Sequence, residues 1–215
     1  MIFILLLGAN SKALGQNKPD TQGWFEIQIS HPLDKKKDWT ATVIFTGRLG
    51  NGAETVTDAR AGFNVTRRVN KIFSAGGGYL YRYSNTTFRR VGYEHRFLLF
   101  ANANIPIGNK IFVTAREMAQ YEDRLSRQND LIFRTKAGLK RVFDVRKLKL
   151  EMYATAEQFY SVHREQPYRY QERLGIVHPF NKHAAIDIFY VRQDDLGTRP
   201  PPSVNGIGTT LRFTL

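Results

Sequence analysis

The histidines, of which the 215-residue chain has five, are the side chains best suited to proton transfer or metal binding. Ser161, His163 and Glu165 lie close together in the sequence, and such residues could serve hydrolysis of a lipid. Their spacing does not make a catalytic site, because the side chains must also meet in space. His178 and His183 flank a Pro-Phe-Asn-Lys turn, but two ligands make a weak metal site. The sequence therefore predicts no catalytic residues, no metal site and no cofactor.

The stretch at residues 147–157, KLKLEMYATAE, alternates polar and apolar side chains without a break. Successive side chains of a β-strand point to opposite faces, so this strand would have one charged and one apolar face. Ordinary strands run to about 5–6 residues, whereas a strand that crosses a bilayer needs about 9–11. The stretch predicts a strand long enough to cross a membrane.

The same two-faced pattern recurs along the whole chain. Connections at one end of these segments are short and rich in turn formers, and those at the other end are more polar and on average longer, as in outer-membrane barrels. The segments are residues 24–30, 39–49, 55–66, 72–83, 88–101, 111–123, 131–141, 147–160, 168–178, 184–193 and 205–215. The shorter predicted connections are 31–37, 67–70, 102–110, 142–145 and 179–183, and the longer ones are 50–54, 84–87, 124–130, 161–167 and 194–204.

These segments predict an all-β fold, an up-and-down antiparallel transmembrane β-barrel of about 10–12 strands, with eleven counted. Because bacterial single-chain barrels have an even number of strands, three alternatives stay open. The first is that segment 24–30 lies outside the wall, the second is that one segment is split, and the third is that another strand lies near residues 16–23. Glu117 falls on the apolar face of its segment, where a bulge could re-aim it. A soluble barrel with the two faces reversed is the other interpretation.

The beginning of the chain predicts export. Residues 1–15 are interpreted as a signal peptide, with residues 16–215 as a single β-barrel domain. No basic residue precedes the apolar core of this segment, so a start further upstream or a buried first strand stays open. There is no cysteine and no apolar run long enough for a membrane-spanning helix. The net charge of +13 on an exported chain favours outer-membrane lipid, lipopolysaccharide or small anions over nucleic acid as partners.

The C-terminus predicts assembly in the bacterial outer membrane. Leu211, Phe213 and Leu215 alternate up to the last residue, which resembles the signal that the barrel-assembly machinery reads. The usual last residue of that signal is Phe, so Leu215 is a departure.

Four phrases carry a resemblance to a family of uncharacterised bacterial envelope proteins, catalogued as domain of unknown function 2490. The resemblance covers nearly all of the chain after the signal peptide, and it implies a barrel in the outer membrane without implying an activity. The phrases are WFEIQISHPLDKKKDWTATVIFTGRL at 24–49, SAGGGYLYRY at 74–83, LKLEMYATAEQFY at 148–160 and RLGIVHPFNKHAAIDIFYVRQ at 173–193.

The charged faces of the segments predict a cationic network inside the barrel. Buried charges must be paired, so a structural or binding barrel with a lumen filled by ion pairs is one interpretation. A narrow anion-favouring channel is the second, and a lipid A-modifying enzyme is the third. The predicted network is Glu26, Arg48, Asp58, Arg60, Arg82, Glu94, Arg96, Arg116, Glu122, Arg134, Lys136, Lys149, Glu151, Glu157, Arg173, Asp187 and Arg212. The sequence does not determine the ligand or the oligomeric state.

Overall fold

The computed structural model describes residues 20–52, 54–85, 91–125, 128–145, 148–196 and 203–215. The predicted signal peptide lies outside these residues. No helix among them is long and apolar enough to cross a membrane. The described residues form eleven strands: β1 (Asp20–Pro32), β2 (Trp39–Gly50), β3 (Thr55–Arg68), β4 (Phe73–Ser84), β5 (Gly92–Gly108), β6 (Ile111–Arg124), β7 (Asp130–Val145), β8 (Leu148–Ser161), β9 (Gln166–Pro179), β10 (Ala184–Asp195) and β11 (Ser203–Thr214).

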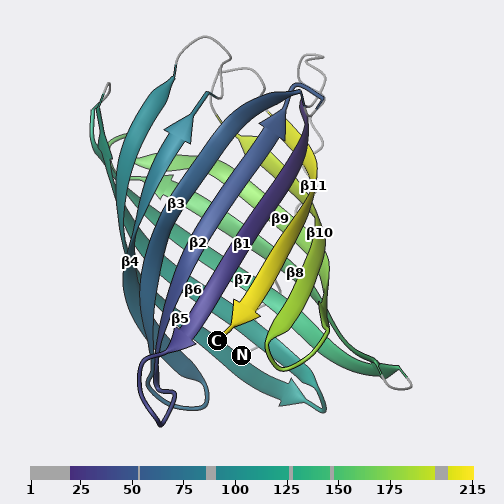
Figure 1. Ribbon diagram of the computed structural model, residues 1–215. Coiled ribbons are helices and arrows are strands. Elements are labelled where there is room, and N and C mark those ends of the chain that lie inside the picture. Colours follow the sequence, from purple (N-terminus) through teal and green to yellow (C-terminus); the bar gives the residue numbers. More distant parts are fainter. Residues whose placement is uncertain (1–19, 53, 86–90, 126–127, 146–147, 197–202) are drawn as a thin grey trace, which may run out of the picture.

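The strands close into one barrel in which each pairs with its neighbours in the sequence, as predicted. The predicted antiparallel arrangement is confirmed for the ten other pairings of the described strands, and the exception is one seam, where β1 and β11 pair in parallel from Asp20–Val204 to Ser30–Thr214. Figure 1 shows these two strands side by side and pointing the same way. In an up-and-down sheet the first and last of an odd number of strands run in the same direction, so closure requires a parallel pair. The segment at 24–30 is therefore part of the wall, as a longer strand than predicted.

The two ends of the barrel differ in their connections. At the turn end, which joins β1 to β2, β3 to β4 and so on, most connections are shorter than at the loop end, which joins β2 to β3, β4 to β5 and so on. The predicted connection at 102–110 is wrong, because β5 continues to Gly108. Within this strand the Asn102 side chain donates a hydrogen bond to Ser74 Oγ at 3.2 Å. Lys110 adopts a φ of 61° in the tight turn that follows.

The wall of the barrel is apolar outside and polar inside, the reverse of a soluble protein. Leu99 on β5 is 70% exposed and Ile207 on β11 is 69% exposed, whereas Glu94 and Asp58 are 1% exposed. A closed sheet leaves no backbone edge unpaired, so an apolar outer surface of this kind is stable in a hydrocarbon environment. The soluble alternative with a charged outer face does not describe this barrel.

Apolar side chains also pack inside the barrel, which the alternation did not predict. Trp24, Phe189, Val191 and Val204 form one buried cluster beside the β1–β11 seam. A second cluster, Leu98, Phe100 and Met118, lies on β5 and β6. The interior is therefore a mixture of charged and apolar patches.

Glu117 stays on the outer surface of β6. The register from Ala101 through Glu117 to Thr135 is continuous, so the bulge suggested for this position is absent. Thr135 Oγ1 donates a hydrogen bond to the Glu117 carboxylate at 2.8 Å, which satisfies part of its hydrogen-bonding capacity.

Leu99→Arg is expected to lower the free energy of unfolding by about 2–4 kcal/mol, because it places a charge midway along a strand on the apolar surface. Leu33→Arg is the control, because Leu33 is also exposed (56%) but lies in a turn, and a change within about 0.5 kcal/mol is expected there. Denaturant titration of the protein folded into lipid vesicles measures both. Equal tolerance of the two substitutions would contradict a lipid-facing wall.

Candidate functional site

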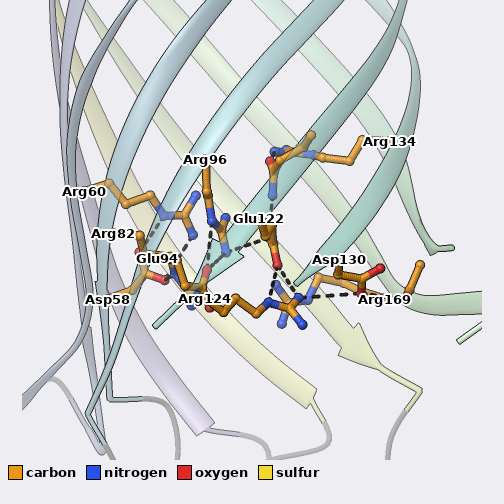
Figure 2. A network of polar contacts seen from close by, with 12 residues as sticks. Asp58, Arg60, Arg82, Glu94, Arg96, Glu122, Arg124, Asp130, Arg134 and Arg169 are labelled. Atoms are coloured by element: carbon orange, nitrogen blue, oxygen red, sulfur yellow. Dashed lines mark hydrogen bonds and ion pairs between the residues drawn. The ribbon is translucent and has the colours of Figure 1, made fainter. Parts of the chain in front are cut away.

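A chain of buried ion pairs crosses the inner wall near the loop end, and we call it the ion-pair belt (Figure 2). It begins on β3, where the Asp58 carboxylate accepts hydrogen bonds from Arg60 Nε at 2.6 Å and Arg82 Nε at 2.6 Å. Arg82 on β4 reaches the other way, and its Nη1 lies 3.1 Å from Glu94 Oε2 on β5. One guanidinium thus bridges two carboxylates on either side of its own strand.

The belt continues across β5, β6 and β7. Arg96 Nη2 lies 2.6 Å from Glu94 Oε2 and 2.8 Å from Glu122 Oε1, so this guanidinium also bridges two carboxylates. Glu122 in turn pairs with Arg124, whose Nη2 lies 3.7 Å from Asp130 Oδ2. The belt therefore consists of Asp58, Arg60, Arg82, Glu94, Arg96, Glu122, Arg124 and Asp130.

Strand geometry explains why the belt can form. Residues opposite one another on neighbouring strands have their side chains close together, and Arg60 lies opposite Arg82, which lies opposite Glu94. Removing charges from water costs several kcal/mol per ion, and close pairs with matched hydrogen bonds offset this cost. The belt therefore permits charged residues where a soluble barrel has an apolar core.

Outside the belt, other ion pairs lie along the inner wall. Arg134 Nη2 lies 2.7 Å from Glu157 Oε1, Lys140 Nζ lies 3.3 Å from Glu151 Oε2, and Arg169 Nε lies 2.5 Å from Asp195 Oδ1. Asp187 accepts hydrogen bonds from Arg212 Nη2 at 2.6 Å and from the Tyr153 hydroxyl at 3.0 Å. These pairs hold long side chains against the wall, because each contact fixes a rotamer.

A cavity of about 690 Å³ occupies the barrel interior, lined by residues from all eleven strands. Among the described residues that line it, ten are basic and four are acidic, so the lining carries a large excess of positive charge. The basic residues are Arg48, Arg60, Arg96, Arg116, Arg134, Lys136, Lys140, Arg169, Arg173 and Arg212, and the acidic residues are Glu26, Glu151, Glu157 and Asp187.

Four of these cations, Arg48, Arg116, Lys136 and Arg173, form no ion pair with a carboxylate of the described residues. Arg48 and Arg116 each have a buried Nε without a hydrogen-bond partner among those residues. Their guanidinium groups instead rest on aromatic rings, Arg48 at 3.5 Å from the centroid of Trp24 and Arg116 at 4.6 Å from that of Phe100. Such stacking orients a guanidinium while leaving its edge N–H groups available.

The structure distributes the predicted network residues unevenly. Asp58, Arg60, Arg82, Glu94, Arg96 and Glu122 meet in the belt. Arg48, Arg116, Arg134, Lys136, Glu151, Glu157, Arg173, Asp187 and Arg212 line the cavity, as does Glu26, which accepts a hydrogen bond from Thr46 Oγ1 at 3.2 Å. Lys149 lies apart from both, exposed near the turn end opposite Asp144 on β7.

Charged residues of the inner wall that lie outside the predicted network include Arg124, Asp130, Arg169 and Asp195. Arg124 and Asp130 lie in a stretch that was assigned to a loop, and Asp195 lies in another. Arg124 lies on the same face as Glu122, one residue beyond the predicted segment 111–123, so a longer segment would have included it. Arg169 lies within the predicted segment 168–178, on the same face as Arg173. Asp130 lies on the same face as Arg134 and Asp195 on the same face as Asp187, one and two residues beyond the predicted segments 131–141 and 184–193.

The candidate nucleophile Ser161 has a structural role. Its hydroxyl donates a hydrogen bond to Asp130 Oδ2 at 2.6 Å and accepts one from the Arg164 backbone N–H at 3.1 Å. His163 contributes its backbone N–H to Asp130 Oδ1 at 3.1 Å. The contacts of Ser161 are therefore those of a buried turn and do not include an imidazole base.

The remaining histidines lie at separate positions. His95 is on the outer surface, where its Nδ1 lies 2.6 Å from the Tyr79 hydroxyl, while its neighbour Glu94 points inward. His183 Nδ1 lies 2.8 Å from the Thr214 carbonyl oxygen, and His178 packs against Phe180. Among the described residues, no group of three or more side chains is arranged to hold a metal ion.

Comparison with known proteins agrees with this architecture. A family model described as a protein of unknown function (DUF2490) matches residues 21–199. The chain belongs to this family. Its function is unassigned, so membership supports the fold and leaves the activity open.

The fold of this DUF2490 protein is similar to a solved structure described as the NanC porin in a rhombohedral crystal form. The TM-score is 0.53, and the match covers 91% of this chain and 99% of the porin at 11% sequence identity. At this identity the likeness shows a shared barrel architecture alone. No curated protein matches the sequence.

Asp58→Asn is expected to destabilise the barrel by about 3–5 kcal/mol, because it leaves two buried guanidinium groups without their shared carboxylate. Asp38→Asn is the matched control, since Asp38 also pairs with an arginine, Arg68, at 2.8 Å but is exposed. A loss of about 0–1 kcal/mol is expected there. Denaturant titrations of both variants in lipid vesicles provide the comparison, and a belt without structural importance would give two equal, small losses.

Proposed function

We propose that this protein is a narrow, anion-favouring channel of the bacterial outer membrane. The observation that carries the proposal is the cavity lined by every strand, with ten basic against four acidic residues among those described. Positive charges held in a low-dielectric wall create a potential that attracts anions and repels cations.

The membrane location is supported by the outer surface. Large apolar side chains such as Phe63 (50% exposed) and Leu174 (58% exposed) point away from the lumen over most of the wall. Tyr79, Tyr81 and Tyr93 gather on the same surface of β4 and β5, as in the aromatic girdles of membrane barrels. Outer-membrane lipid and lipopolysaccharide are the surroundings that this surface fits.

The C-terminal strand fits assembly in that membrane. Leu211 and Phe213 lie on the outer face of β11, and the Leu215 backbone N–H donates a hydrogen bond to the Ser30 carbonyl at 2.9 Å. The last residue is thus fixed to the wall, where barrel-assembly machinery would read the apolar side chains.

The width of the pathway follows from side-chain packing. Arg82, Arg96 and Glu122 of the ion-pair belt occupy the inner wall near the loop end, and their contacts hold them in place. A barrel of this strand number has little interior space once long side chains fill it. The channel is therefore expected to conduct weakly and to pass only small solutes.

The second candidate is a structural barrel whose belt replaces an apolar core and whose loops bind lipopolysaccharide or a protein. The ion-pair belt favours the structural barrel, because its charged side chains form ion pairs with one another. The two candidates differ in whether ions cross the lumen, which electrical recording decides.

The folded protein is expected in the outer-membrane fraction, with a change in gel mobility on boiling. A closed barrel resists detergent until heated, because every strand is hydrogen-bonded on both sides. Fractionation of cells that express the full chain, followed by electrophoresis of boiled and unboiled samples, tests this. Soluble periplasmic protein without a mobility change would contradict the membrane location.

The protein is expected to give small conductance steps when it is reconstituted into planar bilayers under a potassium chloride gradient. Its reversal potential is expected to be shifted from zero toward the equilibrium potential of chloride. Arg173→Gln is expected to weaken this anion preference, since Arg173 lines the cavity. Arg192→Gln is the control, because Arg192 lies on the outer face of the adjacent strand β10 and pairs with Asp194. Electrical silence of the correctly folded protein would exclude the channel and leave the structural barrel.

A further inference from the structure

Two cations face each other on neighbouring strands in the middle of the inner wall. Arg116 on β6 lies directly opposite Lys136 on β7, and both side chains line the cavity. Like charges at directly opposed positions of a sheet destabilise it. Arg60 and Arg82 are also directly opposed, but both donate hydrogen bonds to the Asp58 carboxylate, whereas Arg116 and Lys136 share no such carboxylate among the described residues.

The nearest carboxylate does not neutralise this pair. Glu157 on β8 is opposite Lys136, but its Oε1 is held by Arg134 Nη2 at 2.7 Å and Nε at 2.8 Å. Lys136 has no ion pair of its own among the described residues. Arg116 and Lys136 thus lie near a carboxylate, that of Glu157, which is already paired with Arg134.

A third cation reaches the same part of the wall. Arg173 on β9 lies opposite Thr155, which lies opposite Gly138, two residues along β7 from Lys136. Arg173 and Lys136 both line the cavity. The guanidinium of Arg173 lies 4.7 Å from the ring centroid of Phe189, which backs it on one side.

The chemistry of the three side chains specifies the kind of ligand. Arg116 is backed by Phe100 as Arg173 is backed by Phe189, so both guanidinium groups keep a fixed plane. One edge of Arg173 donates hydrogen bonds to the Gln171 side-chain oxygen, at 2.9 Å from Nε and 3.3 Å from Nη2, whereas the buried Nε of Arg116 has no partner among the described residues. Planar guanidinium groups match anions with two or more oxygen atoms, and an ammonium adds a compact point charge. Neutral hydroxyls of Thr114 and Thr155 line the cavity in the adjacent row.

We propose that Arg116, Lys136 and Arg173 form an oxyanion site inside the barrel, which binds the phosphate or carboxylate group of a small solute. An oxyanion held there relieves the repulsion between Arg116 and Lys136. The site gives the proposed channel a substrate class, namely small oxyanions rather than halides. It rests on the proposed function only in requiring a lumen that is open to water.

The test is the thermal unfolding of detergent-folded protein in sodium phosphate against sodium chloride at equal ionic strength. Ligand that binds only the folded state raises the unfolding midpoint, so phosphate is expected to raise it and chloride is not. Lys136→Gln is expected to weaken the apparent phosphate affinity by about tenfold or more, the scale of one charge-assisted hydrogen bond. Lys136→Arg is expected to retain the phosphate response.

Lys140→Gln is the matched control. Lys140 lies on the same strand and lines the same cavity, but it pairs with Glu151 at 3.3 Å. This variant is expected to keep the phosphate response of the wild type. In chloride, Lys136→Gln is expected to unfold at a higher temperature than the wild type because it removes repulsion, whereas Lys140→Gln is expected to unfold at a lower one.

The outcomes separate the site from the channel. Equal phosphate responses of Lys136→Gln and Lys140→Gln, each shown to be folded by its gel mobility, would mean a general cationic field and would overturn the site. A wild type that does not respond to phosphate would overturn it too. Phosphate binding by a protein that is silent in bilayers would keep the site and reject the channel, and conductance without phosphate binding would do the reverse.

Discussion

The pairing of carboxylates with guanidinium groups inside a closed wall is the interaction on which the rest of this structure depends. The alternation of each strand sends charged side chains inward, where water is scarce and an unpaired charge costs several kcal/mol. The belt from Asp58 to Asp130 meets that cost by letting Arg82 and Arg96 each bridge two carboxylates. Without these bridges the inward-facing charges would be unpaired and would destabilise the barrel in which the apolar face points outward.

The interior is divided between two arrangements. Near the loop end, on β3 to β7, charges satisfy one another and hold the wall rigid. Across β6 to β9 and on β2, cations outnumber carboxylates, and several rest on aromatic rings such as Trp24 and Phe100. The first arrangement suits a scaffold, whereas the second suits an interior that receives anions. Both can operate in one protein, because a rigid belt keeps the cavity from collapsing onto its own side chains.

The outer surface follows the same logic with few exceptions. Its apolar side chains need no partner in hydrocarbon, and Glu117 is a carboxylate that has one in the Thr135 hydroxyl. The parallel seam between β1 and β11 is another irregular feature, and it is a consequence of the odd number of described strands. Neither feature disturbs the register of the neighbouring strands, so the wall remains closed.

The sequence by itself determined the order of the strands and the face on which most of their charged residues lie, because side-chain direction in a strand has a period of two and needs no tertiary information. It also placed Asp58, Glu94 and Glu122 on the inner face. Only the tertiary structure decided the parallel seam, the extension of β5 through Asn102 and the absence of a bulge at Glu117. It alone decided which charges are paired, because partners such as Arg134 and Glu157 meet through the register of separate strands. The place of a residue in the alternation determines to which face of the sheet its side chain points, whereas strand register and barrel closure determine which side chains it contacts.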